Sequence, residues 1–238
     1  MTLRLFVQTP LVAGAEFALG ATAARHAQVR RVQPGDPLRL FDGSGGEWAA
    51  EVTLMTRSAV TVRLLHHLDV DVELATPVTL AVGMPAGERM DWLVEKATEL
   101  GVARIQLLLC ERSVLRVQGE RAQKKREHWQ AVAVAAAEQC GRTRVPHIEP
   151  VCDIQGFTAQ HQPDAERWVL SLRDASMSPQ RIAPGRRLIL LSGPEGGLTE
   201  VEERAALDAG WQSVNLGPRV LRAETAPLAV LAWLGMGA

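Results

Sequence analysis

Short runs rich in apolar residues recur over the first seventy positions, at residues 3–7, 38–41, 48–55 and 59–65. In the last two runs apolar and polar residues alternate. A two-residue period is typical of half-buried β-strands. Turn residues precede two of the runs, Pro-Gly-Asp at 34–36 and a Gly-rich loop at 42–46, and one helix is expected at 22–32. Short strands joined by tight turns predict a small closed or half-closed β-barrel.

The pattern changes after Pro77, where strands begin to alternate with helices. Strands are expected at residues 78–82, 105–109, 167–172, 188–191 and 214–216. Helices are expected at residues 91–100, 121–139 and 225–234, and another is opened by a Thr199–Glu202 capping box and ends at Gly210. This alternation predicts an α/β domain with a mostly parallel sheet. The polar segment 66–77 separates the two patterns, so we expect domains at residues 1–70 and 71–238.

Composition narrows the class of protein. Apolar residues make up 47% of the chain, which supports a real core, and the formal net charge of −1 gives no global attraction to a polyanion. Between Glu111 and His147, however, eight basic residues stand against four acidic ones. Such a run is most often a solvated helix face. The three cysteines are too few and too far apart for a disulfide framework or a zinc site, so we expect reduced thiols and no metal.

Nothing in the hydropathy predicts a membrane protein. Residues 1–20 lack the charged and apolar regions of a signal peptide. The longest Ala-rich run, at 131–137, is far too short for a membrane span. We therefore expect a cytoplasmic protein with no membrane partner.

Three segments combine glycine with groups able to do chemistry. Leu-Ser-Gly-Pro-Glu-Gly-Gly at 191–197 and Asn-Leu-Gly-Pro-Arg-Val-Leu-Arg-Ala-Glu-Thr at 215–225 each follow a predicted strand and precede a helix. Glu-Gln-Cys-Gly-Arg-Thr at 138–143 ends the long predicted helix. Taken singly, each is compatible with a tight turn or a surface ion pair. Their placement favours a ligand site, because open α/β sheets bind ligands at the carboxyl ends of their strands.

Other ligand-binding motifs are missing from the sequence. No G-x-x-x-x-G-K-[ST] predicts a P-loop, and no G-x-G-x-x-G follows an early strand. The chain also lacks a G-x-S-x-G elbow and an H-E-x-x-H metal pair. These absences argue against an NTPase, a Rossmann enzyme, a serine hydrolase and a zinc protease.

The two glycine loops, the 138–143 segment and Lys-Ala-Thr-Glu-Leu-Gly-Val at 96–102 together resemble the ribosomal RNA small subunit methyltransferase E family of the SPOUT superfamily. Arg-Leu-Phe-Val at 4–7, and the residues around His26 and Gly35, resemble its N-terminal PUA-like barrel. Cys140 in place of a more familiar Ser and Val220 in place of Ile are minor departures. The resemblance spans essentially the whole chain.

This resemblance implies a PUA-like RNA-binding barrel at 1–70 and a SPOUT methyltransferase domain at 71–238 with a C-terminal trefoil knot, which general topology rules would disfavour. It implies a homodimer that uses S-adenosylmethionine to methylate N3 of a uridine in 16S rRNA, within the assembled small ribosomal subunit. The implied cofactor site consists of Leu191, Gly193, Gly196, Gly197, Leu216, Gly217, Val220 and Leu221.

The resemblance also suggests how the reaction is assisted. Arg222 is expected to stabilise the developing uracil anion and Glu224 to accept the N3 proton or orient its acceptor, although the two could instead form an internal ion pair. Glu138, Gln139 and Arg142 could line the uracil pocket, from the partner subunit if the protein is dimeric. The expected phosphate contacts are Arg25, Arg30, Arg31, Lys124 and Lys125.

Two alternatives stay open at this point. A SPOUT enzyme could act on another RNA position, such as a ribose or a guanine. The chain could also be a non-catalytic RNA-binding or ribosome-assembly protein, although its intact glycine loops argue against that reading.

Overall fold

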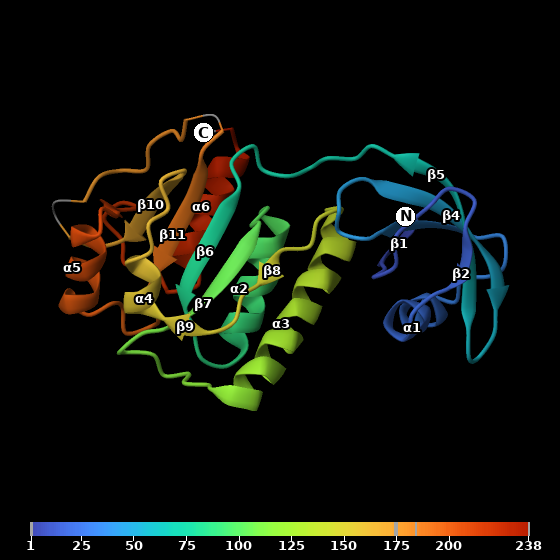
Figure 1. Cartoon of the computed structure of the whole chain (residues 1–238), viewed down its shortest axis with the longest axis horizontal. Helices are drawn as coiled ribbons and strands as arrows, with labels where there is room; N and C mark the ends of the chain where they lie inside the picture. The colour runs from blue at the N-terminus through green and yellow to red at the C-terminus, as the bar shows by residue number, and fades with distance from the viewer. Residues whose placement is uncertain (1, 174–175, 184, 238) are drawn as a thin grey trace. The chain divides into compact units, whose positions relative to one another are not determined.

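The computed structural model describes residues 2–173, 176–183 and 185–237, which form two compact units (Figure 1). Unit 1 consists of Met1–Glu73 and Ala137–Val145, and unit 2 of Leu74–Ala136 and Pro146–Ala238. The sequence placed a single boundary between residues 70 and 71. The end of the long helix nevertheless belongs to unit 1, because residues 137–143 form hydrogen bonds with residues of the first segment.

Unit 1 is a five-stranded sheet with one helix. Its elements are β1 (Leu3–Phe6), β2 (Glu16–Ala18), α1 (Ala21–Val29), β3 (Pro37–Phe41), β4 (Glu47–Met55) and β5 (Val60–Leu68). The strand order is β1-β3-β4-β5-β2, with β1 parallel to β3 and the other pairs antiparallel. Alternate positions such as Leu38, Leu40 and Val62 are fully buried and form one core with Ala27 of α1. The two-residue period of the sequence therefore reflects strands that turn every second side chain toward this core.

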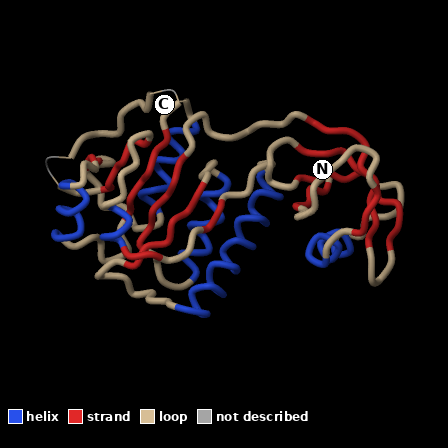
Figure 2. Tube along the Cα trace, viewed as in Figure 1, coloured by secondary structure: helices blue, strands red, loops and turns tan. Residues whose placement is uncertain are grey.

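Unit 2 alternates strands with helices (Figure 2). Its elements are β6 (Val78–Gly83), α2 (Glu88–Glu99), β7 (Arg104–Leu109), α3 (Gly119–Cys140, with its end in unit 1), β8 (His147–Ile148), β9 (Cys152–Asp153), α4 (Ile154–Thr158), β10 (Ala165–Leu170), β11 (Arg187–Ser192), α5 (Glu200–Asp208), β12 (Gln212–Val214) and α6 (Thr225–Gly235). The sheet order is β12-β10-β11-β6-β7-β8, β9 also pairs with β7, and every pairing is parallel.

Helices bury the strands of unit 2. Ala81, Ile189 and Leu191 share an apolar cluster with residues of α4 and α5, whereas Leu188 and Leu190 alternate with them and are equally buried. α6 packs against β11, and α2 packs against α6. Strands buried this completely explain the continuous apolar runs of the sequence. No helix in the described part of the chain is both long and apolar enough to span a membrane.

The structure confirms the predicted α/β fold class with its parallel sheet and its separate N-terminal sheet. Four short elements were not predicted: β2, β8, β9 and α4. β5 also runs to Leu68, through exposed positions that looked like a polar linker in the sequence. Strand order alone does not define a knot, so the trefoil knot stays a prediction.

Candidate functional site

The carboxyl ends of the parallel strands in unit 2 meet at one edge of the sheet, and a cavity of about 620 Å³ lies there. Segments that follow five strands line it: Arg89 after β6, Arg112 after β7, residues 170–172 at the end of β10, residues 192–198 after β11 and residues 214–224 after β12. This is where ligands bind in open parallel α/β sheets. The volume lies within the usual range of small-molecule pockets.

The loop after β11 is compact because two of its glycines cannot carry a side chain. A Cβ on Gly193 would lie 2.8 Å from the backbone nitrogen of Leu198, and Gly197 has a φ of +69°. Gly197 also donates a 2.8 Å hydrogen bond to the carbonyl of Pro194, which closes the turn. At its glycine positions, this loop therefore exposes only backbone atoms to the cavity.

Neighbouring side chains fix the β11 loop in place. Arg112 donates from Nη1 to the carbonyl of Gly196 at 3.0 Å. The carboxylate of Glu195 accepts from the backbone nitrogen of Ala86 at 2.8 Å and faces Arg89 at 3.4 Å. The predicted capping box is present, since Thr199 and Glu202 bond to each other's backbone nitrogen atoms at the start of α5. The loop thus joins a rigid strand to a capped helix.

The loop after β12 lies on another side of the same cavity. The side chain of Asn215 accepts a 2.7 Å hydrogen bond from the backbone nitrogen of Gly217, whose φ is +101°. The chain then reaches Glu224, the residue before α6. The backbone nitrogen atoms of Thr225 and Ala226, at the start of α6, both donate to the carbonyl of Arg222. The loop after β11 and the loop after β12 therefore both contribute residues to the lining of one cavity.

Most of the predicted cofactor residues lie together. Six of the eight line the cavity: Gly193, Gly196, Gly197, Leu216, Val220 and Leu221. Leu191 and Gly217 are absent from the lining; Leu191 is fully buried inside β11. Apolar side chains beside backbone polar groups suit a nucleoside with an aliphatic tail. These residues therefore fit S-adenosylmethionine.

Arg222 and Glu224 both line the cavity but do not pair with each other. Among the described residues, no hydrogen bond or ion pair involves the exposed guanidinium of Arg222. Glu224 is only 7% exposed, and its Oε2 has no hydrogen-bond partner in the described part of the chain. A buried carboxylate oxygen without a partner is costly unless a ligand supplies one. The geometry thus favours groups held ready for a ligand over an internal ion pair.

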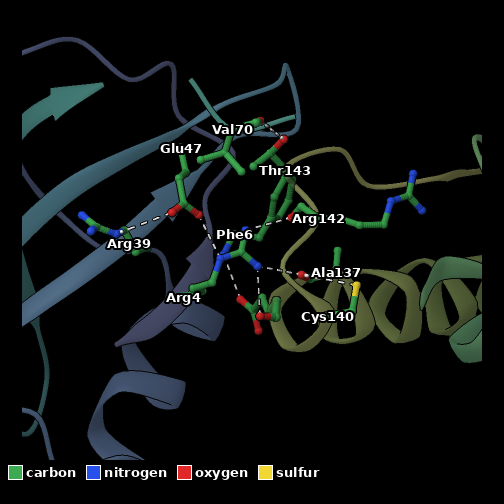
Figure 3. Close-up of polar contacts among 10 residues, drawn as sticks. Arg4, Phe6, Arg39, Glu47, Val70, Ala137, Cys140, Arg142 and Thr143 are labelled. Atoms are coloured by element: carbon green, nitrogen blue, oxygen red, sulfur yellow. Dashed lines mark hydrogen bonds and ion pairs between the residues drawn. The ribbon is translucent and has the colours of Figure 1, made fainter. Parts of the chain in front are cut away.

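Three other predicted residues, Glu138, Gln139 and Arg142, lie in unit 1, at the end of α3 or just after it. Figure 3 labels Arg142 among its neighbours. The carboxylate of Glu138 accepts from the backbone nitrogen of Phe6 at 2.8 Å and lies 3.1 Å from Nδ1 of His26. Arg142 is 3% exposed and its Nε donates to Glu73 at 3.1 Å, whereas Gln139 is exposed. Within one chain, Glu138 and Arg142 therefore hold unit 1 together. Their contribution to a uracil pocket stays a prediction that requires a second chain.

The predicted phosphate contacts are spread over both units. Arg25, Arg30 and Arg31 are exposed on α1 and immediately after it, in unit 1. Lys124 is exposed on α3 in unit 2, and the Lys125 ammonium lies 5.9 Å from the ring centre of Trp129. Solvent exposure is what a phosphate contact requires, but it does not identify one.

Sequence reasoning missed several residues of the cavity. Arg89, Arg112, Leu170, Leu172 and Glu203 also line it. A signal was present for two of them, because Arg112 lies three residues after the predicted strand 105–109 and Leu172 ends the predicted strand 167–172. The carboxyl end of every parallel strand, and not only the glycine loops, was a candidate position.

Comparisons with known proteins agree with this arrangement. Residues 72–235 match the model of an RNA methyltransferase domain, and residues 19–65 match that of an RNA methyltransferase PUA domain. The chain is 31% identical to the ribosomal RNA small subunit methyltransferase E of Bacillus subtilis, over 90% of this chain and 88% of the relative. It is 34% identical to the protein of the same name from Synechocystis, over 98% of this chain and 77% of the relative.

A solved structure extends the similarity to three dimensions. The ribosomal RNA small subunit methyltransferase E of Neisseria gonorrhoeae, bound to S-adenosylmethionine, superimposes with a TM-score of 0.93 at 33% identity. The superposition covers 99% of this chain and 98% of that one.

Proposed function

Because this chain belongs to the ribosomal RNA small subunit methyltransferase E family, we propose that it uses S-adenosylmethionine to methylate N3 of a uridine in 16S rRNA of the assembled small subunit. The observation that carries the proposal is the cavity at the carboxyl edge of the sheet, enclosed by two glycine loops and flanked by Arg222 and Glu224. S-adenosylmethionine supplies a methyl group on a positively charged sulfur.

The residues of the chain contribute binding and orientation. The β11 loop offers backbone groups at Gly193, Gly196 and Gly197, and the β12 loop offers apolar surface at Leu216 and Leu221. Holding two reactants in line supplies a large part of the rate of such a substitution. The rigid anchoring of the β11 loop by Arg112 serves this purpose.

Uridine N3 carries a weakly acidic proton, so the residues around it decide whether it can attack. N3 forms its bond to the methyl carbon as the carbon–sulfur bond breaks, and the N3 proton passes to the carboxylate of Glu224. Arg222 donates to a uracil oxygen and stabilises the negative charge that develops on the ring. The unpartnered, buried Oε2 of Glu224 supports its assignment as proton acceptor.

We further propose that unit 1 binds RNA through Arg25, Arg30 and Arg31, and that Lys124 and Lys125 contact phosphates. We also propose that the enzyme acts as a homodimer in the cytoplasm, where small subunits are found. In unit 2 the apolar side chain of Met236 is 80% exposed and is available for such a contact. In that dimer, the partner's copy of the segment 138–142 would complete the uracil pocket.

The proposed function is tested with labelled S-adenosylmethionine and small subunits that lack the modification. Label should enter 16S rRNA and block reverse transcription at a single uridine, because a methyl group on N3 prevents base pairing. Mass spectrometry of the nucleosides should then find N3-methyluridine. A methylated ribose or guanine would contradict the assignment of the position, and failure to bind S-adenosylmethionine would favour a non-catalytic protein.

A further inference from the structure

A second, smaller cavity of about 250 Å³ lies beside the first in unit 2. Its lining consists of Glu88, Arg89, Trp92, Arg222 and Glu224. Three of these residues, Arg89, Arg222 and Glu224, also line the larger cavity. The two cavities therefore share a wall, and that wall contains the two residues assigned to the chemistry. A group held in the smaller cavity would lie next to a group held in the larger one.

Trp92 is the aromatic side chain of this smaller cavity, and it is 45% exposed. Its helix neighbours Met90 and Leu93 are completely buried, so α2 uses them for packing and leaves Trp92 at the surface. An exposed aromatic ring beside charged groups is the usual platform on which proteins stack an unpaired base.

The helix that carries Trp92 is firmly held. The carboxylate of Asp91 accepts a 2.9 Å hydrogen bond from the indole nitrogen of Trp129, and it lies 2.8 Å from Nε2 of His128. Both partners belong to α3, so two contacts fix the first turns of α2. A ring mounted on such a helix is preorganised for stacking.

The polar groups of the smaller cavity complement one base. The pairing edge of uracil presents an N–H donor between two carbonyl acceptors. Glu224 offers a buried acceptor oxygen without a partner, and Arg89 and Arg222 offer donors. Cytosine would place an unprotonated ring nitrogen against the carboxylate and an amino group against an arginine, leaving both pairs mismatched.

We propose that the smaller cavity is the subsite for the target base: a uracil swung out of its RNA strand stacks on Trp92 and presents its N3 edge to Glu224 and the arginines. This assignment rests on the proposed function and adds the residue that holds the base and the reason why uracil is chosen. Extrusion of a base costs stacking energy, which a new aromatic contact offsets.

The test uses the full-length protein with Trp92→Ala, Trp92→Phe and a control, Val201→Ala. Val201 is 70% exposed on α5 and lines neither cavity. We expect Trp92→Ala to lower kcat/KM for unmodified small subunits by about 10- to 100-fold, the range of a lost base-stacking contact. The Kd for S-adenosylmethionine should stay unchanged in calorimetry, and Trp92→Phe should keep most of the activity.

A binding measurement separates this proposal from the proposed function. Oligouridylate should quench tryptophan fluorescence of the wild-type protein more than oligocytidylate does, and Trp92→Phe should lose that difference. Unchanged kcat/KM in Trp92→Ala, or an equal loss of affinity for S-adenosylmethionine, would overturn the assignment. So would dissociation of an oligomer in sedimentation, since Trp92 would then be a subunit contact. A wild-type protein that binds oligouridylate in this way but transfers no label would refute the proposed function alone.

Discussion

Nε of Arg4 lies 2.9 Å from Oε2 of Glu47, and both side chains are largely buried, at 10% and 11% exposure. The same guanidinium donates to the carbonyls of Ala137 at 2.9 Å and Arg142 at 3.0 Å (Figure 3). Arg4 thus supplies the final turn of α3 with the hydrogen-bond donors that a helix C-terminus lacks. One side chain joins the first strand of unit 1 to the segment that returns to it more than a hundred residues later.

Arg4→Ala should therefore destabilise unit 1 by about 3–5 kcal/mol, the cost of removing one partner of a buried ion pair, because Glu47 keeps only the more exposed Arg39 and the carbonyls of Ala137 and Arg142 lose their donor. Hydrogen exchange followed by mass spectrometry should show faster exchange in residues 137–145. Arg39→Ala is the matched control, because Arg39 lies 3.5 Å from the same Glu47 but is 34% exposed. Its effect should stay below about 1 kcal/mol. Equal losses in the two variants would contradict the role of Arg4 as a helix cap.

Arg222→Ala should lower turnover by about 100- to 1,000-fold, the usual effect of removing one donor to a developing anion. Affinity for S-adenosylmethionine should fall little, because Arg222 is assigned to the base. Calorimetry beside a tritium-transfer assay measures both quantities. Arg204→Ala, at an exposed position on α5, serves as the control. If Arg222→Ala loses binding and rate equally, Arg222 has a structural role instead.

Gly193→Ala should weaken binding of S-adenosylmethionine by roughly one to two orders of magnitude. The new methyl group would lie 2.8 Å from the backbone nitrogen of Leu198, so the β11 loop would have to move, at a cost of about 1–3 kcal/mol. Gly20→Ala is a fair comparison, because its Cβ would meet no atom within 4 Å. Calorimetry and thermal unfolding should be run on both variants. Normal cofactor affinity in Gly193→Ala would remove this loop from the site.

Reversal of charge at Lys124 and Lys125 should weaken binding to small subunits and make it less dependent on salt. Each lost phosphate contact should reduce the slope of log K against log salt by about 0.9 on the duplex scale. Binding measured at several salt concentrations tests this, with Arg204→Glu as a single-reversal control. Unchanged binding would mean that this face of α3 is only solvated.

Cys110 should make the protein sensitive to alkali. Burial raises the pKa of its thiol from 9.0 to about 12. Between these values the unfolded state loses the thiol proton and the folded state keeps it, so the free energy of unfolding falls as pH rises above about 9, by about 1 kcal/mol per pH unit. Denaturant midpoints at pH 8 and pH 10.5 should therefore differ more for wild type than for Cys110→Ala. Identical shifts would exclude Cys110 as the source.

The sequence predicted the larger features because each has a local cause. Continuous apolar runs in β6 and β11 indicate a buried parallel sheet, and the Thr199–Glu202 box marks the start of α5 in the residues themselves. Two-residue strands such as β8 have no period to detect, so they escaped. Arg4 could not have been identified as a cap, since its acceptors lie 133 and 138 residues away along the chain.

The same distinction applies to the candidate site. The glycine loops could be found because φ restrictions and close approach leave a trace in composition. The side chains that complete the cavities, Arg89, Arg112 and Trp92, have no such trace. Only the meeting of strand ends in three dimensions gives them a common position. Glu138 and Arg142 likewise contact Phe6 and Glu73, which are distant in sequence, so no local pattern could have predicted these contacts.

Because residues 137–145 belong to unit 1, the coding sequence of unit 1 is interrupted by part of unit 2, which limits how the gene can recombine. An N-terminal fragment ending near residue 73 would lack the acceptors of Arg4, and Glu73 would lack Arg142. The two units are interleaved in the reading frame, so neither can be exchanged as a simple cassette by recombination at one point. The two sheets must then be inherited together, and substitutions in residues 137–145 and in their partners within unit 1 should arise in matched sets.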